Sequence, residues 1–268
     1  MILTKKSRFK ILLMGICYFA LGSIVIGVSI VSFFFGIENN LHYFGIILYV
    51  LDIFFMLWGR YAEGKGKHIN IGNKLVRKEL RPAEFLEYYE NLINSPDLVI
   101  NEPSIEILHL VSVAYILLDD NERALQIIDE MLLIANEKKK PLVKLLKTSH
   151  LFDMGRNEEA EALFSEVRST KMDFTCQALS DEILKSDRAK ALGDYKTVEL
   201  HYTAKLEKSI PPLDNAGRLI INYTLGEIYE KMNSTEKALQ HYKYCFDNGG
   251  ETAVKNAARD AIKRLSNN

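Results

Sequence analysis

The sequence predicts an all-α protein with a two-helix transmembrane hairpin, an α-solenoid of helical pairs after it, and a C-terminal capping helix. Two long apolar stretches lie within the first 60 residues of the 268-residue chain, and each is long enough to cross a bilayer as a helix. The remaining chain repeats one pattern of small, bulky and turn residues at nearly constant spacing. Such a repeat is typical of stacked helical pairs.

The first apolar stretch runs from Ile11 to Phe35 without a charged side chain. As a helix it would span roughly 37 Å at about 1.5 Å per residue, more than the hydrocarbon core of a bilayer. A second stretch, 41–60, is interrupted by Asp52. A cleavable signal peptide is disfavoured, because the first stretch is too long, ends in phenylalanines and is followed by another. Two transmembrane helices, 11–35 and 41–60, are therefore predicted.

Basic residues flank this hairpin on both outer sides. Residues 1–10 contain four of them and residues 60–81 contain seven, whereas the turn between the spans contains none. By the positive-inside rule, the basic N-terminus 1–10 and everything after the second span are cytoplasmic. Residues 61–81 are predicted to be a basic juxtamembrane linker, and 60–81 are expected to contact anionic lipid.

The rest of the chain, 82–268, is acidic, with a formal net charge of −8. Proteins that bind nucleic acid through its phosphates carry basic surfaces instead. Nucleic acid is therefore not expected as a partner.

Two features of the predicted spans indicate a contact inside the membrane. Gly15, Gly22 and Ser29 recur every seven residues and form a face that another helix can approach closely. Asp52 is costly in hydrocarbon unless it is paired or neutralised, and Tyr18 lies at a similar predicted depth. The small-residue face can pack against the second span, a partner's membrane helix or a second copy. For Asp52 the alternatives are a contact with another subunit, a proton or ion pathway, and an internal bond between protonated Asp52 and Tyr18.

The soluble part contains four copies of one pattern. Each has a small residue, a bulky residue three positions later, a turn residue four after that, then alanine and a second bulky residue one helical turn apart. Asp, Gly and Asn tolerate the left-handed backbone that ends a helix. The copies are Ser112, Tyr115, Asp119, Ala124 and Ile128; Thr148, Leu151, Gly155, Ala160 and Phe164; Ser186, Ala189, Gly193, Val198 and Tyr202; and Gly226, Tyr229, Asn233, Ala238 and Tyr242.

This pattern resembles the tetratricopeptide repeat (TPR), a helix-turn-helix unit of about 34 residues. The third copy departs from it, because Val198 stands in place of alanine and Ala189 in place of the bulky residue. The resemblance implies a TPR-like domain over 82–268. Its repeats are expected near 104–138, 141–172, 177–208 and 216–249, with a capping helix over 251–266.

The resemblance also implies a partner-binding groove lined by the first helix of each pair. A mixed acidic and apolar lining favours a peptide or helix with apolar anchors and some basic residues. Phe152 and Tyr223 are expected to be aromatic anchors. The set that clamps a peptide carboxylate in some family members is missing, since His109 and Val113 stand where lysine and asparagine would be expected. The groove positions are Glu106, His109, Ser149, Phe152, Asp187, Lys190, Tyr223, Glu227 and Glu230.

The sequence contains no phosphate-binding loop, metal-type histidine pair, nucleophile elbow or paired-cysteine motif. We therefore expect no enzymatic activity, no cofactor and no metal. The leading hypothesis is a membrane-anchored adaptor or scaffold whose cytosolic groove binds a partner protein, such as a component of a membrane complex. The alternatives are an accessory subunit of a transporter or channel that acts through Asp52, and an extracytoplasmic repeat domain.

Overall fold

The structure, a computed structural model, describes residues 50, 66–94 and 103–267. The predicted spans 11–35 and 41–60 lie outside the described residues, apart from Val50. Among the described helices, none combines the length and apolarity needed to cross a membrane. The predicted intramembrane contact also lies outside the described residues, and its members are Gly15, Tyr18, Gly22, Ser29 and Asp52.

Residues Ile69–Asn268 form one compact unit. Its described part is all-helical, with eleven α-helices, one short π-helix and no strand. The elements are η1 (Asn73–Lys78), α3 (Pro82–Ile93), α4 (Ile105–Leu117), α5 (Asn121–Ile134), α6 (Lys140–Asp153), α7 (Asn157–Arg168), α8 (Phe174–Lys185), α9 (Asp187–Ala191), α10 (Tyr195–Lys208), α11 (Asn215–Lys231), α12 (Thr235–Asn248) and α13 (Ala253–Ser266).

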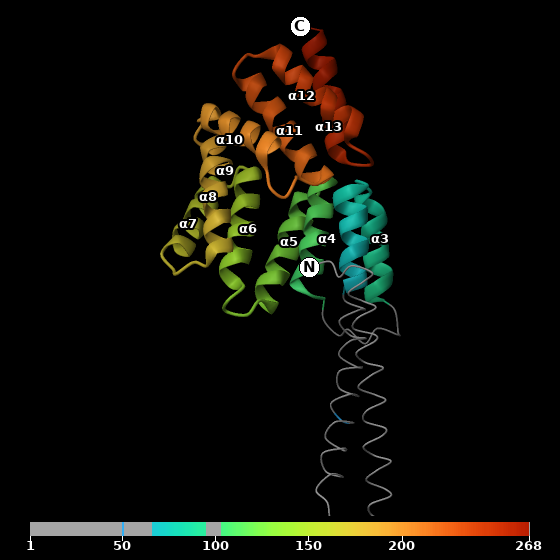
Figure 1. The fold of residues 1–268 in the computed structure, drawn as a ribbon, viewed down its shortest axis with the longest axis vertical. Coiled ribbons are helices and arrows are strands. Elements are labelled where there is room, and N and C mark those ends of the chain that lie inside the picture. The colour runs from blue at the N-terminus through green and yellow to red at the C-terminus, as the bar shows by residue number, and fades with distance from the viewer. Residues whose placement is uncertain (1–49, 51–65, 95–102, 268) are drawn as a thin grey trace, which may run out of the picture. The chain divides into compact units, whose positions relative to one another are not determined.

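Consecutive helices pack as hairpins that stack into a solenoid-like array (Figure 1). The hairpins are α4 with α5, α6 with α7, and α11 with α12, and α13 packs against α12 at the C-terminal end. In the third hairpin the first helix is interrupted at Ser186, so that α8 and α9 together face α10.

The turns between paired helices have the backbone conformation that the sequence predicts. Asp119, Gly155, Gly193 and Asn233 all have positive φ, between 55° and 76°. This left-handed conformation is cheap for glycine and tolerated by Asp and Asn, so it ends one helix and lets the next turn back. The prediction for these four turn positions is confirmed.

Polar side chains begin many of the helices. Each accepts a hydrogen bond from the backbone N–H three residues later, which satisfies one of the donors that a helix leaves free at its first turn. The capping residues are Ser104, Asp120, Asp173, Asp194, Asp214 and Thr252.

The small residues of the repeated pattern lie where helices touch. Ala124, Ala160 and Ala238 have no exposed surface. At Gly226 on α11, a Cβ atom would lie 2.6 Å from a ring carbon of Tyr242 on α12. The close approach of α11 and α12 therefore requires glycine at this position.

Residues 69–81, assigned to a linker by their basic composition, belong to the folded unit. η1 packs against α3, α4 and α11, and Val76 in η1 is fully buried. A Cβ atom on Gly72 would lie 2.8 Å from the Leu110 side chain in α4. Four of its thirteen residues are lysine or arginine, but its apolar residues pack against distant helices. The folded unit therefore begins at Ile69, not at 82.

Candidate functional site

A group of polar side chains connects α6, α9 and α11. The Ser149 hydroxyl on α6 donates a hydrogen bond to Asp187 Oδ2 on α9, at 2.6 Å. Lys190 Nζ, also on α9, lies 3.0 Å from Glu227 Oε2 on α11. Asp153 at the end of α6 interacts electrostatically with Lys190 and Glu227. We call Ser149, Asp153, Asp187, Lys190 and Glu227 the polar cluster.

The spacing of these residues along their helices places their side chains on the same faces. Ser149 and Asp153 are four residues apart on α6 and therefore share one face, as do Asp187 and Lys190, three residues apart on α9. The interruption at Ser186 places Asp187 at the start of α9, where the Ser186 hydroxyl lies 2.8 Å from Asp187 Oδ1. Two hydroxyls thus hold the Asp187 carboxyl in place.

The carboxyl groups of the polar cluster are strongly perturbed. Burial, and then the charge of Asp153, raise the pKa of Asp187 to about 7. Burial also raises the pKa of Asp153, against the opposing effect of Lys190. The residue keeps exposed surface, but the protein around its carboxyl group displaces enough water to disfavour the charged form. Burial lowers the pKa of Lys190, yet the carboxylates of Glu227 and Asp153 outweigh it and raise this pKa.

Three carboxyl groups therefore face a single ammonium group. The polar cluster carries a net negative charge when no more than one carboxyl is protonated, and it is neutral when Asp153 and Asp187 both hold a proton. Glu227 and Lys190 keep about a third of their side-chain surface exposed, 37% and 33%, so a ligand can reach them. The polar cluster is suited to a cationic group such as a lysine or arginine side chain.

Four of the nine predicted groove positions meet in the polar cluster, and the others do not. Glu106 forms an ion pair with Lys139 at 2.9 Å. His109 Nε2 lies 3.1 Å from Arg77 Nη2 in η1. Burial, and then the charge of Arg77, lower the pKa of His109 to about 4. The segment 69–81, through Arg77 of η1, therefore covers the surface around His109.

The two predicted aromatic anchors, Phe152 and Tyr223, differ in how they are packed. Phe152 is 7% exposed and packs in a hydrophobic core cluster, so its expected role as an accessible anchor is wrong. Tyr223 is half-buried and packs edge-on against Tyr242, with ring centroids 5.6 Å apart. Glu230 accepts a hydrogen bond from the Tyr242 hydroxyl at 3.0 Å and pairs with Arg264 at 2.6 Å. Tyr223 and Glu230 thus have structural partners on α12 and α13.

Asp153 in the polar cluster and Arg77 beside His109 were not among the predicted positions. Asp153 lies one helical turn after Ser149, so the spacing of four residues could have revealed it. Arg77 carries no such signal, because its partners His109 and Asp214 lie 32 and 137 residues away in the sequence.

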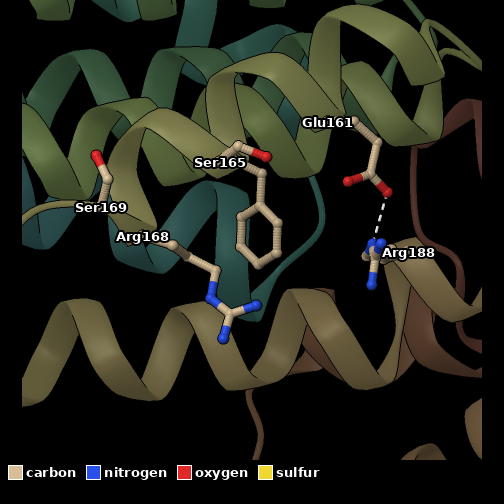
Figure 2. Close-up of a pocket in the computed structure, with 6 residues that line it drawn as sticks. Glu161, Ser165, Arg168, Ser169 and Arg188 are labelled. Carbon is tan, nitrogen blue, oxygen red and sulfur yellow. Dashed lines mark hydrogen bonds and ion pairs between the residues drawn. The ribbon is translucent and has the colours of Figure 1, made fainter.

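A shallow pocket of about 370 Å³ lies between α7 and α9 (Figure 2). Its two arginines already have partners within the protein. Arg188 Nε lies 2.5 Å from Glu161 Oε1, and the Arg168 guanidinium stacks over the Phe164 ring at 5.6 Å from its centroid. This pocket is therefore a weaker candidate for ligand binding than the polar cluster. Its lining is Glu161, Phe164, Ser165, Arg168, Ser169 and Arg188.

Within the described residues, no group of three or more His, Cys, Asp or Glu side chains is placed to hold a metal ion. Comparison with family models, with curated proteins and with solved structures finds no match to the chain.

Proposed function

We propose that the chain is a membrane-anchored adaptor whose TPR-like unit, on the cytoplasmic side, binds a partner protein through the polar cluster. The partner supplies a lysine or arginine side chain from a helix or an extended peptide. One observation carries the proposal: Ser149, Asp187 and Glu227, from three successive hairpins, converge on one site where three carboxyl groups face one ammonium group.

The packing of η1 within the unit supports a basic side chain as the ligand. Val76 is buried beside α4 and α11, while the neighbouring Arg77 lies 3.2 Å from Asp214. The first helices of the hairpins therefore accept a helical segment that carries an apolar residue next to a basic one. A partner helix of the same character would suit the polar cluster on α6, α9 and α11.

The membrane anchor supports an adaptor over a freely diffusing binding protein. An uncharged stretch as long as 11–35, followed by a second apolar stretch, holds the unit at a membrane. Confinement there raises the effective concentration of the unit toward partners in the same membrane.

The test compares two glutamates with matched surroundings. Glu227 and Glu161 are each paired with a basic side chain of α9, and each keeps 37% of its side-chain surface exposed. The full-length protein is purified from its native membranes after crosslinking, as the wild type, as Glu227→Gln and as Glu161→Gln. A charge-assisted contact contributes about 1.5–3 kcal/mol, so Glu227→Gln should weaken partner binding by roughly 10- to 100-fold.

Glu161→Gln is expected to recover the partner at the wild-type level. The specific adduct should also disappear when the partner's basic residue is replaced after identification. Equal recovery with all three proteins would show that the polar cluster does not bind the partner.

A further inference from the structure

The connections α5–α6 and α7–α8 lie on the same edge of the unit. Lys144 in the first turns of α6 pairs with Glu166 in the last turn of α7 at 2.6 Å, and Val167 at the end of α7 shares a core cluster with Cys176 at the start of α8. Both connections are visible along one border of the helical array in Figure 1. We call the residues 133–140 and 168–174, together with the end of α3, the loop edge.

The end of α3 lies on the same edge. Tyr89, one turn before the end of α3, packs against the core cluster that contains Ala135 after α5 and Val143 at the start of α6. Ile93 ends α3 nearby and is half exposed, at 50%.

Large apolar side chains are concentrated on the loop edge. Within the described part of the unit, eight large hydrophobic side chains are exposed, and four of them belong to this edge: Ile93, Leu133, Ile134 and Phe174. Leu133 and Phe174 are the most open of the four, at 85% and 89%. Exposed apolar groups that gather in one region usually mark an interaction surface.

The loop edge is also basic within an acidic unit. Residues 133–140 and 168–174 contain five basic side chains against two acidic ones, whereas 82–268 as a whole has a formal charge of −8. Among the described residues, Lys138 and Lys171 have no ion-pair partner. Lysines next to an exposed phenylalanine and leucine match the chemistry of an anionic membrane interface, where rings lie at headgroup depth and ammonium groups contact phosphates.

The unit's chain also begins at this edge. The helical segment before residue 79 and α3 are joined by only three residues, 79–81, and they pack together. They form a hairpin, so Ile69 lies beside the last turns of α3, near Ile93. The uncharged stretch 11–35 precedes this point in the sequence.

We propose that the loop edge rests on the anionic surface of the membrane that anchors the chain, with Phe174 and Leu133 at headgroup depth and Lys138 and Lys171 on lipid phosphates. This inference relies on the membrane anchoring in the proposed function. It is independent of partner binding by the polar cluster. The contact would hold the unit in one orientation on the bilayer.

The test measures the depth of individual side chains in the full-length protein. The single tryptophan, Trp58, is replaced by phenylalanine, and a new tryptophan is placed by Phe174→Trp or Leu133→Trp. Leu192→Trp is the control, because Leu192 is 70% exposed at the α9–α10 turn, at the far end of the third hairpin from Phe174. Each protein is reconstituted into vesicles of phosphatidylglycerol and phosphatidylcholine that contain spin-labelled lipid quenchers.

The tryptophans at positions 174 and 133 should be quenched, and the one at 192 should not. Each lysine near an anionic surface contributes about 1 kcal/mol, so Lys138→Gln and Lys171→Gln should each lower the docking equilibrium about fivefold. Pure phosphatidylcholine, which carries no net headgroup charge, should lower it at least as much as both substitutions together. Equal quenching at 174, 133 and 192 in vesicle-bound protein would overturn the proposal.

Flotation of the vesicles separates the two proposals. A chain that does not float with the vesicles lacks the membrane anchor, and the loop-edge proposal then fails together with the anchoring. A chain that floats without quenching at 174 and 133 refutes the loop-edge contact alone. Loss of the partner with Glu227→Gln can be measured in either case.

Discussion

Replacement of Val76 by alanine tests whether residues 69–81 are an integral part of the folded unit. Val76 has no exposed surface and belongs to the core cluster that joins η1, α4 and α11. Loss of two buried methyl-sized groups costs about 0.8 kcal/mol each, and the remaining cavity adds to this, for a total of about 2 kcal/mol. Because about 1.36 kcal/mol is a tenfold change in an equilibrium constant, the open population should rise ~30-fold.

Labelling of the Cys245 thiol in the native full-length protein measures this opening. Cys245 is fully buried in the same core cluster, and burial raises its pKa to about 12, so it reacts only when the cluster opens. Cys17 and Cys176 are replaced by serine in all proteins. The Lys74→Ala control changes an exposed side chain of the same helix, 67% open to solvent, and should leave the rate unchanged. An unchanged rate with Val76→Ala would refute the conclusion that the segment and the helices open together.

Three further predictions concern single positions. Gly226→Ala should lower the free energy of unfolding by about 2 kcal/mol in a denaturant titration, because its Cβ would lie 2.6 Å from the Tyr242 ring. Gly250→Ala should cost about 2 kcal/mol in the same assay, since Gly250 has φ of +55° and its Cβ would lie 2.6 Å from Leu80 Cβ. A smaller cost in either case would show that the backbone relaxes. The folded-state pKa of Asp187 is raised from its ordinary value of 3.8 to about 7, so its stabilising contribution is complete below pH 3.8 and is lost as pH rises to about 7. Relative to Asp187→Asn, the wild-type thermal midpoint should therefore fall by roughly 6–12 °C between pH 4.5 and 7.5, and parallel profiles would contradict the raised pKa.

Docking of the unit's own segment narrows the surface that is left for a partner. η1 bridges α4 in the first hairpin and α11 in the fourth, and the Glu251 N–H donates to the Leu80 carbonyl at 2.9 Å. The predicted groove residue His109 is covered by Arg77 of this segment and is not available to a partner. The polar cluster on α6, α9 and α11 is the part of the predicted groove where partly exposed charges from three hairpins meet.

Much of the array follows from local sequence. Asp119, Gly155, Gly193 and Asn233 determine where each first helix ends, because their backbone must adopt positive φ. Alanine or glycine at the helix contacts is dictated by sterics at short range, as at Gly226. These turn residues and small residues recur in four copies along the chain. The four copies together predict four helical hairpins.

Other features depend on contacts that no local pattern contains. Val76 and Arg77 lie in a segment whose basic composition predicts a linker, and only the packing of η1 on α4 and α11 shows that they are part of the core. The burial of Phe152 depends likewise on packing against α8 of the third hairpin, whose Ile183 lies in the same core cluster, because helical periodicity alone does not tell a core face from a binding face.

The sequence by itself thus determined the helical class, the turn positions and the apolar N-terminal stretches, because these depend on neighbouring residues and on composition. The tertiary structure decided which side chains meet: Ser149, Asp187 and Glu227 in the polar cluster, and Arg77 with Asp214. These residues are up to 137 positions apart. Their contacts arise from the packing of whole helices against one another and not from any single motif.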